Sequence, residues 1–187
     1  MARIFSVLAL FTVLPTAARA QDMPLSQILI DGEGWKKVDA PGAKPKPPRF
    51  ELKGPDGRGS LHEYTPGTYS PDRGTQFLAV RNYGYVVAVP ARADGSVVGK
   101  AANYAPLRTR RGEKTIDVTG LATDRDGRIY AATDLGVQVF DPTGRLCGVL
   151  TPAAEGVPEH MVFEGDKLTL WIGNEKYARK LNTSGAR

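Results

Sequence analysis

Short runs of apolar and β-branched residues recur along the chain at intervals of roughly eight to ten residues, separated by Gly, Pro, Asp and Asn. No long stretch with the spacing of an amphipathic helix follows Ala20. The clearest example is VTGLATDRDGRIYAATDLGVQVFDPTGRL, residues 118–146. With the residues just after it, this stretch predicts four strands, at 120–123, 128–133, 136–141 and 146–151. An all-β fold built of hairpins is therefore expected.

The same four-strand unit recurs elsewhere in the chain. It appears upstream in TPGTYSPDRGTQFLAVRNYGYVVAVPARADGSVVGKA and again, with three strands, in PEHMVFEGDKLTLWIGNEKYARKLNTS. A partial hairpin lies in FELKGPDGRGSLHEY. Repeated four-stranded units predict a β-propeller, although a β-sandwich has similar strands and is the alternative. The segment LSQILID, residues 25–31, is expected to be a strand that completes the last unit and closes the ring.

The start of the chain predicts export. Arg3 precedes an apolar run at 4–14 and the small-residue motif Ala18-Arg19-Ala20, which together indicate a cleavable signal peptide over residues 1–20. The run is shorter than the about 20 residues that a membrane span needs, so no membrane span is expected. A secreted or periplasmic location follows. The expected divisions are 21–38 for the closing strand, 39–50 for a Pro-rich linker and 51–187 for the propeller blades.

Composition narrows the chemistry. The 187 residues carry a formal net charge of +5, and the basic clusters at 44–49 and 108–111 are predicted to be solvated loops, so no nucleic-acid partner is expected. Cys147 is the single cysteine, which excludes an intramolecular disulfide. With His62 and His160 as the two histidines, a zinc site built from several histidines is not expected.

The motif TDRDGR, residues 123–128, invites comparison with a calcium-binding loop. Asp124 and Asp126 suggest two of the ligands of such a loop. The glutamate that should follow its glycine by six residues is replaced by Thr133. The motif therefore predicts a hairpin turn.

The stretch VTGLATDRDGRIYAATDLGVQVFDPTGRLCGVL closely resembles the senescence marker protein/gluconolactonase family, which includes regucalcin and the luciferin-regenerating enzyme. YSPDRGTQFLAV and VPEHMVFEGDKLTLWIGNEKYARK extend this resemblance. The resemblance implies a six-bladed propeller, of which this chain supplies about three to four blades. It also implies hydrolysis of sugar lactones with one divalent cation, calcium or zinc, which polarises the lactone carbonyl and helps to generate hydroxide.

The residues of the family's metal site are not matched. Thr119 falls where the family has an aspartate that binds the metal and acts as a base, and Thr65 falls where it has an asparagine before Ser-Pro-Asp. The family's Glu-Gly-Pro motif does not occur. A neutral threonine does not supply the charge that a hard cation needs. Asp117 lies two residues before Thr119, which would place it on the same side of a strand, and it is the candidate replacement metal ligand.

Two further residues are candidates for ligand binding. His160 falls where many family members have an asparagine at the start of an inner strand, so it is expected to line the funnel with Thr65 and Thr119. Tyr83 lies beside Asn82 and Gly84 in a turn, where its ring would be exposed and could stack on a sugar.

These features predict an exported, gluconolactonase-like propeller whose lactone hydrolase activity is impaired or lost, with no catalytic residue identified. Three hypotheses stay open. Hydrolysis could be rebuilt around Asp117. The propeller could instead bind a carbohydrate, a lactone or a protein without catalysis. The chain could also be a half ring that pairs with a second copy as a homodimer, because closed symmetric dimers are the commonest oligomers.

Overall fold

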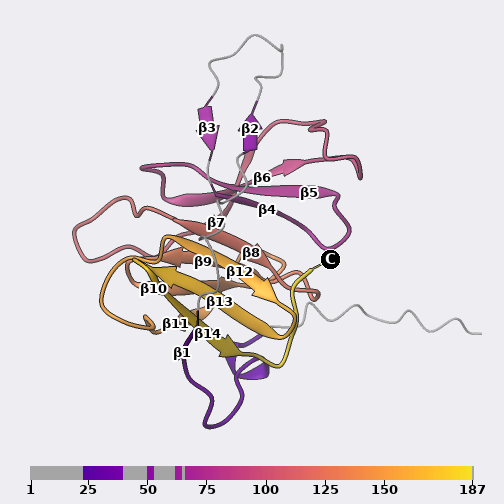
Figure 1. Ribbon diagram of the computed structural model, residues 1–187. Coiled ribbons are helices and arrows are strands. Elements are labelled where there is room, and N and C mark those ends of the chain that lie inside the picture. Colours follow the sequence, from indigo (N-terminus) through magenta and orange to yellow (C-terminus); the bar gives the residue numbers. More distant parts are fainter. Residues whose placement is uncertain (1–22, 40–49, 53–61, 65, 187) are drawn as a thin grey trace, which may run out of the picture.

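The computed structural model describes residues 23–39, 50–52, 62–64 and 66–186 (Figure 1). Within these residues the chain forms three four-stranded antiparallel sheets and one separate hairpin. The first blade holds β4 (Gly67–Tyr69), β5 (Thr75–Ala79), β6 (Tyr85–Pro90) and β7 (Ala102–Pro106). The second blade holds β8 (Gly120–Thr123), β9 (Ile129–Thr133), β10 (Gly136–Phe140) and β11 (Leu146–Leu150).

The third blade combines both ends of the described chain. It holds β12 (His160–Glu164), β13 (Lys167–Ile172), β14 (Glu175–Lys180) and, at its outer edge, β1 (Lys36–Val38). The separate hairpin pairs β2 (Phe50–Leu52) with β3 (His62–Tyr64). The innermost strand of the second blade, β8, contacts both β4 and β12, so the three blades are arranged side by side. The all-β, incomplete-propeller prediction is therefore confirmed.

The four strands predicted in the second blade are all present, within one residue of their expected bounds. The three strands of the last unit and the partial hairpin also form. One glycine in the second blade is required by its surroundings. Gly136 has a φ of 111°, and a Cβ atom there would lie 2.2 Å from the carbonyl oxygen of Leu150. Only glycine accommodates both the left-handed backbone and this close approach.

A strand from the N-terminal segment 21–38 does complete the last unit, but the position predicted for it, 25–31, is wrong. Leu25–Gln27 is a short 3-10 helix, η1, and the third blade is completed by β1, with Lys37 opposite Tyr177 of β14. The reason is the spacing of the apolar side chains. Leu25 and Ile28 both pack on the same core, whereas a strand would place residues three apart on opposite faces. β1 was missed because its three residues are exposed and two of them are lysines.

Apolar side chains fill the two junctions between blades. Between the first and second blades the core includes Phe77, Val86, Ile129 and Phe140, which are almost completely buried. A second core, between the second and third blades, holds the buried side chains Ile28, Tyr130, Val137, Val139, Leu150, Met161, Leu168 and Leu170. Through Ile28, the N-terminal segment therefore packs into the core between the second and third blades.

Each blade has two ends, which define two surfaces. The proximal end is where the innermost strands β4, β8 and β12 begin, and the distal end is where they finish. Because the strands are antiparallel, the loops β5–β6, β7–β8 and β9–β10 lie at the proximal end. The turns β4–β5, β8–β9 and β10–β11 lie at the distal end.

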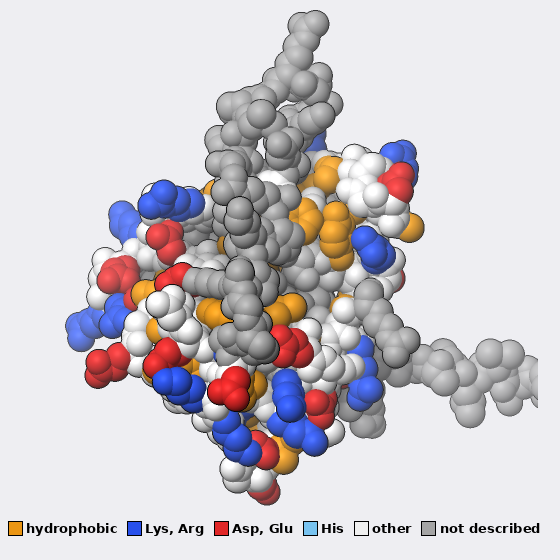
Figure 2. Space-filling model, in the orientation of Figure 1, with side chains coloured by type: hydrophobic (Ala, Val, Ile, Leu, Met, Phe, Trp, Pro, Cys, Tyr) orange, Lys and Arg blue, Asp and Glu red, His pale blue; other side chains and the backbone are white. Residues whose placement is uncertain are grey.

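The surface over the third blade carries both signs of charge. Figure 2 shows acidic and basic side chains interspersed over the lower part of the view, where β1 and β14 lie in Figure 1. The third blade also has ion pairs between its strands, including Lys37 with Glu175 and Lys176 with Glu164. This part of the surface therefore presents alternating charges rather than a basic patch.

Two distal turns of the second blade share one design. In DRDGR, residues 124–128, the Asp124 Oδ1 atom accepts hydrogen bonds from the backbone amides of Asp126 and Arg128, at 3.0 and 2.9 Å. In DPTGR, residues 141–145, Asp141 does the same for Thr143 and Arg145, at 2.8 and 3.0 Å. The carboxylate thus caps the backbone of each turn. The prediction that TDRDGR is a hairpin turn is confirmed.

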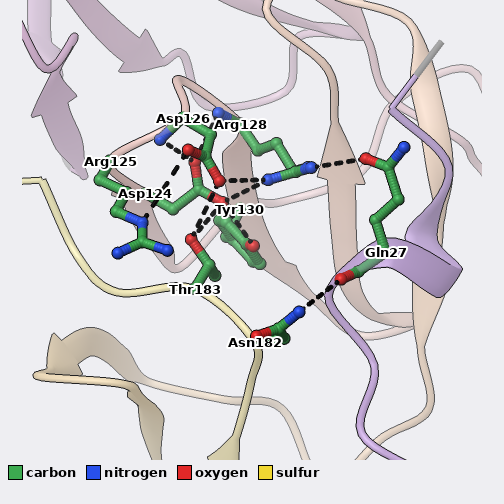
Figure 3. A network of polar contacts seen from close by, with 8 residues as sticks. All are labelled: Gln27, Asp124, Arg125, Asp126, Arg128, Tyr130, Asn182 and Thr183. Carbon is green, nitrogen blue, oxygen red and sulfur yellow. Dashed lines mark hydrogen bonds and ion pairs between the residues drawn. The ribbon is translucent and has the colours of Figure 1, made fainter.

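The first of these turns is the centre of a buried polar network (Figure 3). Arg128 and Asp124 are almost completely buried, and the Nη1 atom of Arg128 lies 3.1 Å from Asp124 Oδ2. Tyr130 and Thr183 also donate hydrogen bonds to Asp124 Oδ2, at 3.0 and 3.2 Å. The Nη2 atom of Arg128 donates to Gln27, at 3.0 Å. The network therefore joins the N-terminal segment, the second blade and the C-terminal segment.

Acid is expected to destabilise the fold through the turn that Asp141 caps. Burial raises the pKa of Asp141, but hydrogen bonds from Thr143 and from the Arg145 amide outweigh it and hold the pKa below its ordinary value of 3.8. The folded protein then binds fewer protons than the unfolded chain. This stabilisation is complete above the ordinary pKa and is lost as the pH falls through the folded-state pKa.

Urea denaturation between about pH 6 and about pH 2 tests this expectation, because stability should fall most steeply below about pH 4. Asp141→Asn should be less stable than the unaltered protein near neutral pH and should lose less stability on acidification. Equal acid dependence in both proteins would contradict the role of this carboxylate.

Candidate functional site

A depression at the proximal end brings together loops from the first and second blades. Its volume is about 340 Å³, and it lies among the β5–β6 loop, the β7–β8 connection and the β9–β10 turn. Its lining consists of Asn82, Glu113, Thr115, Ile116, Asp117, Thr119, Asp134 and Val157. Two of the residues proposed from the sequence, Asp117 and Thr119, are therefore in one cavity of the size range that holds small ligands.

The β7–β8 connection, which carries Glu113 and Asp117, is held by a buried glutamine. The Gln138 side chain accepts a hydrogen bond from the Arg108 amide at 2.8 Å and donates one to the Arg108 carbonyl at 2.9 Å. This pair of bonds imitates strand pairing. Arg110 then forms an ion pair with Asp134 of the β9–β10 turn, at 3.0 Å. The connection is therefore attached to the second blade on one side of the depression.

Asp117 and Thr119 differ in how much of their bonding capacity is already used. The Thr119 hydroxyl donates to the Ala132 carbonyl at 3.3 Å, and the Thr119 amide donates to the same oxygen at 2.9 Å. Asp117 is exposed, and its Oδ1 atom lies 3.5 Å from the Asn82 amide, a long hydrogen bond. The carboxylate can therefore accept hydrogen bonds from a ligand, while the hydroxyl hydrogen of Thr119 is directed to the backbone.

The other sequence candidates lie apart from this depression. His160 begins β12 and is buried, with its ring 5.1 Å from that of Trp171. Tyr83 is exposed in the β5–β6 loop, and its hydroxyl donates to Asn103 at 2.6 Å. Neither residue lines the depression. Thr65 lies outside the described residues.

The donor set of the depression does not fit a divalent cation. Within the described ranges, no three His, Cys, Asp or Glu side chains are grouped closely enough to hold a metal ion. Calcium takes about six to eight oxygen ligands, several of them carboxylates, and zinc takes about four ligands. Asp117 stands beside a threonine whose hydroxyl is bonded to the backbone. The residues that line the depression therefore do not form a site that would hold a divalent cation for hydrolysis.

Sequence reasoning missed Asn82, Glu113 and Asp134, which line the same depression. Each lies in a different loop and in no recognisable motif. The signal that could have found them is the blade topology, because alternate connections between successive antiparallel strands lie at the same end of the blades. Asn82 also has a φ of 55°, a left-handed backbone that asparagine tolerates better than most residues.

These features define a class of fold: side-by-side, four-stranded blades with a polar depression where the innermost strands begin. No protein-family model matches the chain, and no curated protein matches it. Within the described residues, no helix has the length and apolar character that crossing a membrane requires.

Two solved structures have a fold similar to that of this chain. A gluconolactonase from Xanthomonas campestris aligns with a TM-score of 0.52 at 23% identity, over 68% of this chain and 42% of that chain. A second structure, provisionally described as a gluconolactonase, aligns with a TM-score of 0.55 at 18% identity, over 86% of this chain and 59% of that chain. The chain thus has the fold of gluconolactonase-type β-propellers and spans roughly half the length of these two proteins.

Proposed function

We propose that this chain is an exported, gluconolactonase-like propeller that binds a sugar or sugar lactone at its proximal depression without metal-dependent hydrolysis. One observation supports the proposal: Asp117 and Thr119 line the same polar cavity, at the end of the blades where the innermost strands begin. The exposed carboxylates of Asp117 and Glu113 are acceptors for ligand hydroxyl groups. The Asn82 side chain adds an amide beside them.

The absence of turnover follows from the residues, in two steps. A carboxylate at position 119 would serve as both metal ligand and base in the family that the sequence resembles. The threonine found there supplies neither function, since its hydroxyl donates to Ala132 and carries no charge. Binding by hydrogen bonds alone remains available, because it needs only acceptors and donors placed around the ligand.

Isothermal titration calorimetry with D-glucono-δ-lactone, D-gluconate and D-glucose tests the binding. We expect saturable heat from at least one of these compounds. Asp117→Asn, which keeps the shape of the side chain and removes its charge, should weaken binding about tenfold. Asp94→Asn is the matched control, because Asp94 caps an exposed distal turn through the Ser96 amide. Absence of heat with all three compounds would rule out the small-molecule function.

A hydrolysis assay separates this proposal from the enzymatic alternative. Lactone opening followed by pH-stat, with added calcium or zinc, should proceed at the rate of the buffer alone. A metal-dependent rate that disappears in Asp117→Ala would instead show a lactonase rebuilt around Asp117. The stability of Asp117→Asn and of Asp117→Ala should be checked by urea denaturation, so that a loss of binding or rate is not confused with unfolding.

A further inference from the structure

A second and larger cleft lies at the distal end, between the first and second blades. Its volume is about 620 Å³, within the range of small-molecule sites. One wall is the sheet of the first blade, and the other is formed by the β8–β9 and β10–β11 turns of the second blade. The polar depression is at the opposite end of the same two blades. The two cavities are therefore separate.

Small side chains create the floor of this cleft. Phe77, Ala88 and Ala102 are direct neighbours across β5, β6 and β7 and form one row that lines the cleft. Ala88 on β6 and Ala102 on the edge strand β7 have small side chains, which leave an apolar strip between the larger side chains around them. Tyr104 closes the outer side, with its ring 5.0 Å from that of Phe77. Its hydroxyl donates to the Pro142 carbonyl, which ties the two walls together.

The carboxylates at the rim of the distal cleft already have hydrogen-bond or ion-pair partners within the protein. Asp72 accepts hydrogen bonds from the Ser70 hydroxyl at 2.6 Å and from the Gly74 amide at 3.0 Å. Asp126 is bound to the buried Arg128, at 3.0 Å. Both carboxylates thus serve the protein's own turns.

The two rim cations are not used in this way. Among the described residues, none forms a hydrogen bond or ion pair with the Lys100 ammonium group. Arg125 has a side chain that is 64% exposed, and it forms a long ion pair with Asp126, 3.9 Å from its Nε atom, which is beyond hydrogen-bond distance. These two side chains lie on opposite walls, Lys100 before β7 and Arg125 in the β8–β9 turn. Their free donors suit an anion.

We propose that the distal cleft binds a small amphipathic anion, an apolar ring that bears one carboxylate. The ring lies on the strip of Phe77, Ala88 and Ala102, where its burial removes apolar surface from water. The carboxylate accepts hydrogen bonds from Lys100 and Arg125, and bonds between charged partners of this kind are the stronger ones. The apolar strip selects against hydrophilic anions such as free phosphate, which gain nothing from it.

Calorimetry with 1-naphthoate as the probe tests this site in the full chain. The neutral 1-naphthamide and the cationic 1-naphthylmethylamine have the same ring and serve as comparison ligands. We expect 1-naphthoate to bind most tightly and to bind more weakly as salt is added. Lys100→Gln and Arg125→Gln should each weaken its binding about tenfold. Lys114→Gln, which removes an exposed lysine at the proximal end, should leave it unchanged.

A filling variant tests the location independently of charge. Ala102 is exposed, so Ala102→Leu should leave the fold intact while occupying the apolar strip and abolishing 1-naphthoate binding. Equal binding of 1-naphthamide with no effect of Lys100→Gln or Arg125→Gln would overturn the anion site. Tighter binding of the amine would assign the cleft to cations instead. Asp117→Asn should not affect 1-naphthoate, so this proposal and the sugar-binding proposal can fail separately.

Discussion

Replacing Asp124 with asparagine is expected to lower the free energy of unfolding by about 3 kcal/mol, the largest effect of any single substitution considered. The asparagine oxygen can still accept the backbone hydrogen bonds of the turn, but its NH2 group replaces the charged oxygen that accepts from Arg128, Tyr130 and Thr183. Arg128 is 3% exposed and would lose the carboxylate oxygen that lies 3.1 Å from its Nη1 atom. Asp126, on the same nitrogen at 3.0 Å, compensates only in part because it is 40% exposed.

Asp141→Asn provides the matched control for this prediction. It occupies the same position in a turn of the same design, but its arginine, Arg145, is 61% exposed rather than buried. An exposed ion pair contributes little, so this variant should lose about 1 kcal/mol or less. Urea denaturation followed by tryptophan fluorescence measures both.

A second substitution identifies the physical cause. Adding Arg128→Met to Asp124→Asn removes the stranded charge, and part of the lost stability should return. Equal losses for Asp124→Asn and Asp141→Asn, or no recovery in the double variant, would show that backbone capping rather than the buried charge governs stability here.

Shortening the chain after Asn182 is expected to lower the free energy of unfolding by roughly 3–4 kcal/mol, at about 1 kcal/mol for each hydrogen bond lost. Ala186 donates to Thr123 at 2.9 Å, and Ser184 accepts from the Arg125 amide at 2.9 Å. Gly185 donates to Gly165 at 3.1 Å. The same change removes Thr183 from the buried carboxylate of Asp124 and admits water to the network.

Ser184→Ala is the control for the shortened chain. The bond at this position is made by the Ser184 carbonyl, so removal of its hydroxyl should change stability by less than about 0.5 kcal/mol. Thermal unfolding followed by circular dichroism compares the three proteins. A shortened chain as stable as the unaltered one would show that the segment after Asn182 lies on the blades without stabilising them.

These two predictions separate stability from binding. The Asp124 network and the C-terminal segment act at the distal turns and at the junction of the second and third blades. Asp117 and Thr119 lie at the proximal end, in a connection held by Gln138. Ser184→Ala should therefore leave sugar binding unchanged. Homodimerisation into a full ring stays a prediction, for which light scattering is the measurement.

The strands could be predicted from the sequence because their signals are local. The alternation and spacing of apolar residues in 118–151 place each strand of the second blade, and Asp-Gly and Pro-Thr-Gly place its turns. The N-terminal segment was misjudged for the opposite reason. Its apolar residues suit a strand by composition, but the core accepts Leu25 and Ile28 on one side, which requires a helical turn.

The candidate site could be predicted only in part. Resemblance indicated Thr119, and proximity along the chain indicated Asp117, so these two were found together. Asn82, Glu113 and Asp134 could not be found in this way, since they come from three loops that meet only after the blades pack. His160 was singled out by resemblance, as the residue at the start of an inner strand, but its ring packs on Trp171.

The sequence by itself determined the all-β blades, their turns and the threonine in place of the family's carboxylate at position 119, because each depends on residues close together in the chain. Tertiary structure decided what those blades bring together. It alone paired Lys36–Val38 with the third blade, enclosed Arg128 with Asp124 and Thr183, and opened cavities at both ends of the first two blades. Burial and charge pairing depend on distances between segments far apart in sequence, which no local pattern encodes.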